Sequence, residues 1–369
     1  MNTITVTLAD WVHNLDPVIL PISGRLAVRW YGLSYALGFF VAWLFMRWLS
    51  KRGACAVPAA RTADAILLTA IITVVGGRLG YVLFYQPGLL NDFSSSFPFW
   101  GVFDTTQGGM ASHGGIIGAI VGAWLVSRGW KVSDNEGNIS RAGACPLRHV
   151  LDTFALLCPF GLFFGRLANF VNGELLGRVV AGPGESAPWW AVRFPQEFSE
   201  RFKELSEDQQ VAMLQFGQQF AQGNESPGIG YERAVSMLHE GVPGMAEKFA
   251  QILNARHPSQ LYQALAEGVV LATVLWIIAR KPRLPGIIGC WFMITYGVLR
   301  VVTEFWRLPD SHLVTQRIAG LSRGQWLSVL MVGIGIAFLL RWRHSGEPKM
   351  GGWAYSRADT TPNEAITTP

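Results

Sequence analysis

Ionisable and strongly polar side chains occupy unusual positions in this sequence of 369 residues, because many of them lie in or beside long apolar runs. An ionisable group at the centre of a membrane span costs roughly 2.5–3.5 kcal/mol on insertion scales, so such residues are functional candidates by default. Most of them lie near the start or the end of a run, on the side that the orientation predicted below places in the outer third of the membrane: Tyr31, Arg78, His113, Arg166, Asn169, Glu174, Gln260, Tyr262, Arg300, Glu304 and Arg307. Asp152 and Glu267 differ, since they lie near the opposite end and the middle of a run.

The arginines predict an anion-binding site. Arg78, Arg166 and Arg300 each lie about one turn inside an apolar run, although a terminal Arg can also reach the lipid headgroups from such a place. Glu304 follows Arg300 by four residues and offers it a partner on the same helix face. We expect Arg78 and Arg166 to lack enough carboxylates to neutralise them. Guanidinium groups bind phosphate through two parallel hydrogen bonds, so a phospholipid headgroup is the nearest suitable anion.

His113 is the candidate base, because a neutral imidazole can accept a proton near pH 7. Four glycines follow it, at positions 114, 115, 118 and 122. Small residues at this spacing allow two helices to pack closely, and that role alone would explain them. The same glycines would also leave room for a substrate beside the imidazole, so both interpretations stay open.

Seven apolar runs must position these side chains. Half of the residues are hydrophobic, only 15% are charged and the mean hydropathy is +0.27, which together favour a membrane protein over a soluble one. We therefore predict an all-α polytopic membrane protein with seven transmembrane helices. The runs cover residues 26–49, 63–85, 111–130, 148–170, 259–279, 286–306 and 325–340.

The distribution of Lys and Arg predicts the orientation. These residues follow the first, third, fifth and seventh runs, whereas residues 86–110 contain none, so the N-terminus should be periplasmic and the C-terminus cytoplasmic. The predicted parts are a periplasmic N-terminal segment (1–25), spans one to four (26–170), a periplasmic head with an amphipathic stretch around 197–220 (171–258), spans five to seven (259–343) and a disordered cytoplasmic tail (344–369).

Composition and motifs limit the function classes. The formal net charge of +5 comes mostly from residues between the apolar runs, which indicates membrane topology and no nucleic-acid partner. The four cysteines have no CxxC spacing, and no HExxH or paired-carboxylate motif occurs, so we predict neither a metal nor a bound cofactor. Two alternatives to an enzyme are an anion transporter or channel, and a lipid receptor without a base.

Six stretches carry a resemblance to a known family. They read RWYGLSYALGF at 29–39, GGRLGYVLFY at 76–85, GGMASHGGIIG at 108–118, GRLANFVNGELLGR at 165–178, HPSQLYQALAEG at 257–268 and YGVLRVVTEFWR at 296–307. In these stretches the chain resembles bacterial prolipoprotein diacylglyceryl transferases. The resemblance implies a seven-span inner-membrane enzyme that needs no cofactor. It also implies transfer of the diacylglyceryl group of phosphatidylglycerol to the lipobox Cys thiol of a prolipoprotein signal peptide, with release of glycerol 1-phosphate.

The resemblance also implies residue roles, carried over by motif. The catalytic set would be His113, Arg166, Arg300 and Glu304. The substrate-binding set would be Tyr31, Arg78, Asn169, Glu174, Gly177, Gln260, Tyr262 and Arg307. Two positions depart from the family pattern: Ala168 stands where Gly is usual, and Gln263 stands where Glu is usual. The head segment is also longer than the resemblance leads us to expect.

Overall fold

The computed structural model describes residues 11–23, 26–95, 99–104, 109–133, 139–308, 317–318 and 320–355. The chain forms two compact units, which are treated separately below. The first comprises Met1–Gly38, Pro159–Leu271 and Thr295–Gly333, and the second comprises Phe39–Cys158, Ala272–Ile294 and Ile334–Pro369.

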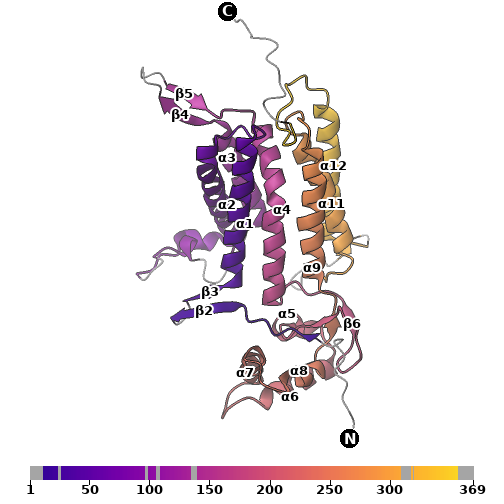
Figure 1. The fold of residues 1–369 in the computed structure, drawn as a ribbon. Helices are drawn as coiled ribbons and strands as arrows, with labels where there is room; N and C mark the ends of the chain where they lie inside the picture. The colour runs from indigo at the N-terminus through magenta and orange to yellow at the C-terminus, as the bar shows by residue number, and fades with distance from the viewer. Residues whose placement is uncertain are drawn as a thin grey trace, which may run out of the picture. The chain divides into compact units, whose positions relative to one another are not determined.

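Five helical segments among the described residues are long and apolar enough to cross a membrane (Figure 1). They are α1 (Trp30–Lys51), α2 (Thr62–Phe84), α4 (Leu147–Asn172), the continuous segment Ser259–Ile278 and α12 (Arg323–Trp342). Two further apolar helices, α3 (Ser112–Ser127) and α11 (Ile287–Thr303), have 16 and 17 residues. At 1.5 Å per residue they reach only about 25 Å of a hydrocarbon core about 30 Å thick. The prediction of a multi-pass membrane protein is therefore confirmed, while seven complete spans stay a prediction.

The first predicted span begins too early. Its first four residues form β3 (Leu26–Arg29), which pairs antiparallel with β2 (Val18–Ser23), and α1 begins only at Trp30. Hydropathy alone misses this boundary, because the hairpin strands are as apolar as the helix: Leu20 and Ile22 in β2 are exposed hydrophobic side chains.

In the first unit, four short strands form one sheet in the order β1-β7-β8-β6. β1 (Trp11–Val12) runs parallel to β7 (Val192–Arg193), and β8 (Ala255–Arg256) pairs antiparallel with β7 and with β6 (Val179–Ala181). Trp11 and Val12, which belong to the predicted N-terminal segment, therefore complete the sheet of the predicted head.

Helices of the head pack around one apolar core. They are α5 (Glu197–Arg201), α6 (Glu207–Gln218), α7 (Pro227–His239) and α8 (Met245–Ala250), with the 3-10 turn η4 (Phe202–Glu204) after α5. Phe216, Tyr231 and Phe249 lie at the centre of the core. The predicted amphipathic stretch around 197–220 is thus helical, but it is broken into two helices because Ser206 caps α6 and stops the preceding turn.

In the second unit, glycines bring α2 and α3 into backbone contact. A Cβ atom on Gly114 would lie 2.3 Å from the Gly76 carbonyl oxygen, and one on Gly118 would lie 2.4 Å from the Ile72 carbonyl oxygen. Any larger residue would force the helices apart. The packing interpretation of Gly114, Gly118 and Gly122 is confirmed, since Gly122 approaches Thr69 of α2 in the same way.

Asp152 has a structural role in the second unit. Its buried carboxylate accepts hydrogen bonds from the backbone N–H groups of Gly286 and Gly289, both at 2.7 Å. These N–H groups belong to the first turn of α11, where no intrahelical acceptor exists. The carboxylate therefore caps α11 from α4. The remaining described elements of this unit are η1 (Ala59–Arg61), η2 (Pro87–Asn91), η3 (Gly101–Phe103), β4 (Trp130–Ser133), β5 (Ile139–Ala142) and α10 (Leu271–Ile278), whose first residue still belongs to the first unit.

The prediction of a disordered tail from His344 is wrong for residues 344–355. Met350 exchanges two backbone hydrogen bonds with Arg283, of 2.8 and 2.9 Å, and the Trp353 indole N–H donates to the Trp276 carbonyl at 2.8 Å. Polar and glycine-rich composition suggested disorder, but the half-buried Trp353 and the backbone pairing with Arg283 fix the segment. We call residues 346–355 the C-terminal strap; residues 356–369 lie outside the described part of the chain.

Candidate functional site

A chain of ion pairs forms the polar centre of the first unit. Glu267 accepts hydrogen bonds from Nε and Nη2 of Arg166 on one carboxylate oxygen, at 3.0 and 2.8 Å, and its other oxygen lies 3.9 Å from Nη1 of Arg300. Arg300 also pairs with Glu304 at 3.1 Å, as the four-residue spacing predicted. Arg307 lies 3.7 Å from the same Glu304 oxygen. Three helical segments, α4, Ser259–Ile278 and α11, thus bring their charged residues together.

The cluster is buried and carries a net positive charge. Glu267 is fully buried, and the side chains of Arg166 and Arg300 are 17% and 13% exposed. Among the described residues, the cluster holds three guanidinium groups and two carboxylates, which is an excess of one positive charge. The expectation that Arg166 lacks a carboxylate was wrong, because Glu267 neutralises it across 101 residues of sequence. The surplus charge belongs to the whole cluster.

The placement of Glu267 depends on a rare helical geometry. Residues Ala264–Val270 form the π-helix η5, directly after α9 (Ser259–Gln263). Single π-turns inside α-helices are frequent at functional sites, because the wider turn changes where side chains point. Glu267 was not in the predicted site, although an ionisable residue in the middle of an apolar run was a signal that could have identified it.

Gln263 and Gln260 precede Glu267 on the same helical segment, and both are fully buried. Gln260 donates a hydrogen bond to the Glu174 carbonyl oxygen. Within the described part of the chain, neither polar atom of the Gln263 side-chain amide has a hydrogen-bond partner. A buried amide without partners costs free energy unless a ligand or water binds it.

A second polar group surrounds Glu174. Asn169 donates hydrogen bonds to the Tyr31 hydroxyl and to a Glu174 carboxylate oxygen, both at 2.9 Å, and Asn172 donates to the other carboxylate oxygen at 3.3 Å. The Glu174 carboxylate is therefore held by two amides rather than by a cation. Such a group can accept hydrogen bonds from hydroxyl groups of a ligand.

Gly177 and the neighbouring Arg307 lie side by side on two paired chain segments. Arg178 N–H donates to the Trp306 carbonyl and Leu308 N–H donates to the Leu176 carbonyl, at 2.9 and 3.2 Å. A Cβ atom on Gly177 would lie 2.1 Å from the His257 carbonyl oxygen, so this position requires glycine for close backbone approach.

Tyr262, another residue of the predicted binding set, lies beside the same segments. Its hydroxyl is 3.4 Å from Nδ1 of His257, and its ring packs edge-on against Trp306. His257 in turn stacks on Trp190 of the head, with ring centroids 4.8 Å apart. Tyr262 therefore joins the end of the spanning segment to the head through aromatic contacts.

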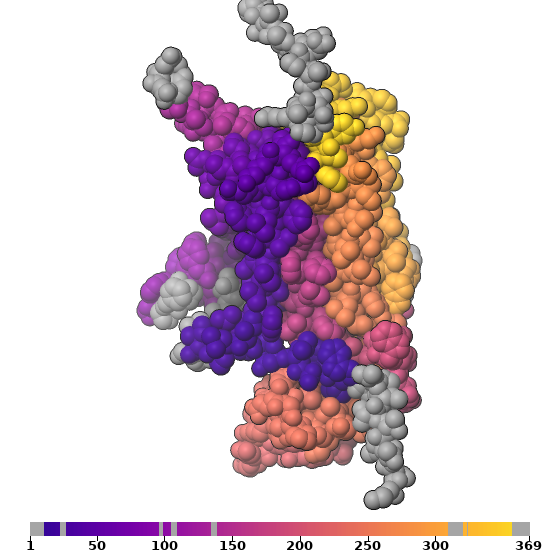
Figure 2. All heavy atoms as spheres, in the orientation of Figure 1, coloured from indigo at the N-terminus to yellow at the C-terminus, as the bar shows by residue number. Residues whose placement is uncertain are grey.

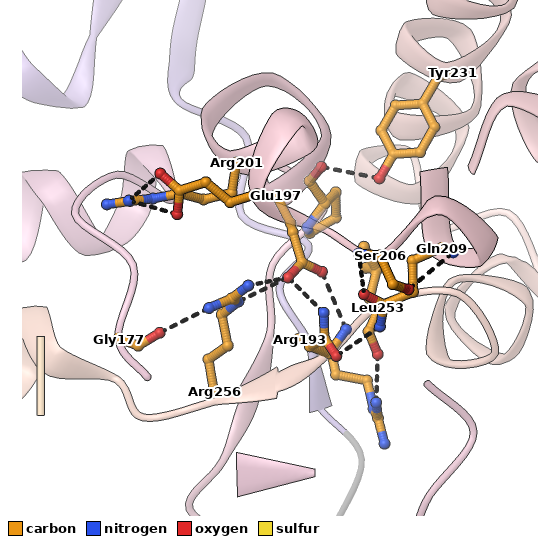
Figure 3. A network of polar contacts seen from close by, with 12 residues as sticks. Gly177, Arg193, Glu197, Arg201, Ser206, Gln209, Tyr231, Leu253 and Arg256 are labelled. Atoms are coloured by element: carbon orange, nitrogen blue, oxygen red, sulfur yellow. Dashed lines mark hydrogen bonds and ion pairs between the residues drawn. The ribbon is translucent and has the colours of Figure 1, made fainter. Parts of the chain in front are cut away.

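A buried ion pair in the head supports the segment that carries Glu174 and Gly177 (Figure 3). Glu197 is fully buried and accepts hydrogen bonds from Arg256 and Asn254. Arg256 also donates to the Gly177 carbonyl oxygen at 3.0 Å. Sequence analysis missed Glu197 and Arg256, because their pairing depends on the sheet of the head.

Arg78, in the second unit, is bound differently. It is 8% exposed, and it donates hydrogen bonds to the backbone carbonyls of Gly101, Val102, Asp104 and Gly109, at 2.6–2.9 Å. These donors hold the chain between α2 and α3, a role that the sequence did not indicate. A direct role in substrate binding stays a prediction.

His113 lies in the first turn of α3, also in the second unit. Its side chain is exposed, and its ring lies 5.7 Å from the rings of both Phe84 and Tyr85. An exposed imidazole beside aromatic rings is accessible to a substrate thiol. That His113 lies at the same depth in the membrane as the arginine cluster of the first unit stays a prediction.

Comparison with known proteins gives one consistent result. A sequence model described as prolipoprotein diacylglyceryl transferase matches residues 17–341. The phosphatidylglycerol–prolipoprotein diacylglyceryl transferase of Bdellovibrio bacteriovorus is 38% identical over 366 residues, which cover 93% of this chain and 97% of that protein. The enzymes of the same name from Neisseria gonorrhoeae and Burkholderia multivorans are each 37% identical, over 89% and 94% of this chain and 96% and 97% of their own lengths. With most of its length matched, and with the motif residues gathered as described, this chain belongs to the prolipoprotein diacylglyceryl transferase family.

Proposed function

We propose that this protein is a phosphatidylglycerol–prolipoprotein diacylglyceryl transferase that catalyses the first step of lipoprotein maturation. The thiolate of the lipobox Cys attacks C3 of the glyceryl group of phosphatidylglycerol. A C–S bond forms as the C–O bond to phosphate breaks, and glycerol 1-phosphate leaves as an anion with the bonding electron pair. The observation that carries this proposal is the buried cluster of three arginines and two glutamates with one surplus positive charge.

Arg166 and Arg300 are the residues that stabilise the leaving phosphate. Negative charge grows on the phosphate oxygens as the C–O bond breaks, and donors fixed in a site of low dielectric stabilise such charge strongly. Nη1 of Arg300 makes no hydrogen bond in the described structure, so it is available to a phosphate oxygen. Glu267 and Glu304 orient the two guanidinium groups, and Arg307 adds the charge that makes the cluster cationic.

Tyr31, Asn169 and Glu174 bind the glycerol headgroup. Their hydroxyl, amide and carboxylate groups can form hydrogen bonds with the two free hydroxyls of the phosphatidylglycerol headgroup. The glycerol part of that headgroup is uncharged, so it needs no cation. Gln260 and Gly177 fix the backbone around Glu174, and Tyr262 fixes the segment beside it. The arginines therefore bind the phosphate, and Tyr31, Asn169 and Glu174 bind the headgroup hydroxyls.

His113 accepts the thiol proton. A free thiol has a pKa near 8.5, so it is a weak nucleophile at neutral pH until a base removes its proton. General-base assistance is worth roughly 10²- to 10⁴-fold in rate.

The proposed topology has seven spans, a periplasmic N-terminus and head, and a cytoplasmic C-terminus in the bacterial inner membrane. The alternation of Lys and Arg between the connecting segments supports it. Reporter fusions after Lys51, Arg141 and Lys281 should give cytoplasmic signals, and fusions near Asp92 and Gly223 periplasmic ones. A periplasmic signal after Arg141 would overturn the orientation.

One assay separates the proposed enzyme from a transporter or a lipid receptor. Purified protein is incubated with phosphatidylglycerol and a lipobox peptide, and mass spectrometry detects the thioether-linked diacylglyceryl peptide. A receptor would bind the lipid without forming product, and a transporter would move an anion without altering the peptide. Absence of product with bound lipid would contradict the proposal.

The base assignment has its own test. His113→Gln should retain phospholipid binding and lose transfer by roughly 10²- to 10⁴-fold. The deficit should shrink between about pH 6.5 and 9, because hydroxide then supplies thiolate without the imidazole. A mutant-to-wild-type ratio that stays constant over this range would assign His113 a positioning role instead.

A further inference from the structure

The C-terminal strap lies beyond the residues that the family model matches, which end at 341, and it is fixed in the second unit by several independent contacts. Trp353 lies between two other tryptophans, with its ring centroid 6.0 Å from Trp48 and 6.2 Å from Trp276. Glu347 forms an ion pair with Arg148 at the start of α4. Figure 2 shows the yellow strap residues at the surface, beside the indigo residues that follow α1.

Two glycines give the strap its course. Gly351 and Gly352 have φ angles of +78° and +89°, and a Cβ atom on Gly352 would lie 2.5 Å from Pro282. Only glycine adopts this conformation at little cost in such a confined place. The strap is therefore a built element of the second unit, with a defined path over the chain that follows α1.

The strap also positions a guanidinium group. Arg52 donates a hydrogen bond to the Trp353 carbonyl oxygen at 3.2 Å, and its guanidinium carbon lies 4.6 Å from the centroid of the Trp48 ring. Both contacts restrict an otherwise flexible side chain, so less entropy is lost when the guanidinium binds a ligand.

A cavity of about 580 Å³ lies between the strap and the turn that follows α1. Buried Cys55 and Val57 form its floor, and exposed Arg52, Lys349 and Tyr355 form its rim. The volume is within the range of small-molecule sites, which is about 300–1,000 Å³. None of the described residues that line this cavity is acidic, and Arg52 and Lys349 give its rim two positive charges.

We infer that this cavity binds the phosphate-bearing headgroup of an anionic phospholipid. The cavity lies beside the C-terminal end of α1, an apolar helix long enough to span a membrane, and basic pockets beside spanning helices bind anionic headgroups. Arg52 binds the phosphate through its fixed guanidinium, and Lys349 adds a second charge-assisted contact. The apolar floor receives the glycerol backbone of the lipid. This site is a second lipid site, and it uses none of the residues assigned to the transfer reaction.

The test compares two double variants of the full-length protein that remove the same charge. Arg52→Gln with Lys349→Gln removes the rim cations, and Lys51→Gln with Arg343→Gln removes two exposed cations outside the cavity. Each is titrated in detergent with dioleoyl phosphatidic acid and with dioleoyl phosphatidylcholine, and native mass spectrometry counts the lipids retained. We expect the rim variant to lose one phosphatidic acid site by roughly tenfold or more in affinity, and the control variant to change by less than about twofold.

A deletion of residues 346–369 provides the second arm, and transfer activity reports that each variant is folded. The variant that lacks residues 346–369 should lose the same phosphatidic acid site as the rim variant, and it should keep transferase activity. Equal loss in both double variants, or no loss in the rim variant and the deletion, would overturn the site. Complete displacement of phosphatidic acid by an equal concentration of inorganic phosphate would overturn the lipid assignment.

Discussion

Two buried arginines, Arg300 in the first unit and Arg78 in the second, satisfy their guanidinium groups in opposite ways. Arg300 lies between two carboxylates, at 3.1 and 3.9 Å, and keeps one nitrogen without a hydrogen bond. Arg78 directs its nitrogens to backbone carbonyls at 2.6–2.9 Å. In the proposed function Arg300 uses its remaining nitrogen to bind the phosphate, whereas the backbone carbonyls engage Arg78 in holding the chain between α2 and α3.

The difference teaches that an intramembrane arginine is not by itself a ligand site. Its position in the sequence is the same in both cases, about one turn inside an apolar run. What distinguishes the two is the acceptor: a carboxylate for Arg300 and a backbone carbonyl for Arg78.

The largest effect should come from removing the shared guanidinium. Arg300→Ala should lower kcat by roughly 10²- to 10³-fold, because one preorganised donor to the leaving group is lost. Arg300→Lys should not restore most of that activity, since an ammonium cannot make two parallel hydrogen bonds to phosphate. Transfer kinetics at saturating phosphatidylglycerol measure both. Rescue by Lys would reduce Arg300 to a simple point charge and weaken the comparison with Arg78.

A fall in pH should destabilise the head of the first unit. His13 is fully buried, and burial lowers its pKa from 6.5 to about 4. Below pH 6.5 the unfolded chain binds a proton that the folded head excludes, so stability is complete above pH 6.5 and is lost as the pH falls toward 4. The full loss is about 3 kcal/mol.

Amide hydrogen exchange, corrected for its intrinsic pH dependence, should therefore show the strands of the head opening more often at pH 5 than at pH 7. The helices α2 and α3 serve as the internal reference. His13→Phe should remove the pH dependence of the head; if it persists unchanged in that variant, another group is responsible.

Arg78→Lys should affect stability more than chemistry. Lys keeps the charge but cannot reach carbonyls on both sides of the loop, and each buried carbonyl left without a donor costs about 1–3 kcal/mol. We expect a lower Tm with kcat per folded enzyme within a few-fold of wild type. A large loss of kcat at unchanged Tm would instead place Arg78 in direct contact with substrate, and the two arginines would then be alike.

The smallest effect should come from charge at Gln263. Gln263→Glu adds a third carboxylate beside the cluster and removes its net positive charge, so KM for phosphatidylglycerol should rise several-fold with little change in kcat. Gln263→Met serves as the control, because Met is uncharged like Gln and has a similar volume. A larger rise in KM for Met than for Glu would show that hydrogen bonding by the amide, rather than charge, matters at this position.

Sequence predicted the spanning helices well, because apolar composition is a local property. The fifth predicted run, 259–279, corresponds to Ser259–Ile278 in the structure. The same reasoning failed at residues 26–29, where an apolar hairpin strand precedes the helix. It also failed in the strap, where Trp353 fixes a segment whose composition is otherwise polar.

The polar contacts were predictable only where they were local. The Arg300–Glu304 pair followed from a spacing of four residues, and Asn169 with Glu174 came from one motif. Glu267, the partner of Arg166, lies 101 residues away in the sequence, and a π-helix orients its side chain. No rule based on residue spacing predicts such a contact. The acceptors of Arg78 are backbone carbonyls. Every residue has one, so the sequence does not show which of them accept a hydrogen bond.

The parallel pairing of β1 with β7 determines an order of events during synthesis. Trp11 and Val12 leave the ribosome early, yet their partners Val192 and Arg193 are made only after α4 is complete. β7 is itself braced by β8, whose residues come later still. Strand β1 must therefore remain unpaired while α1, α2, α3 and α4 are inserted into the membrane. Trp11 and Val12 thus reach their final place only after β7 and β8 have been made.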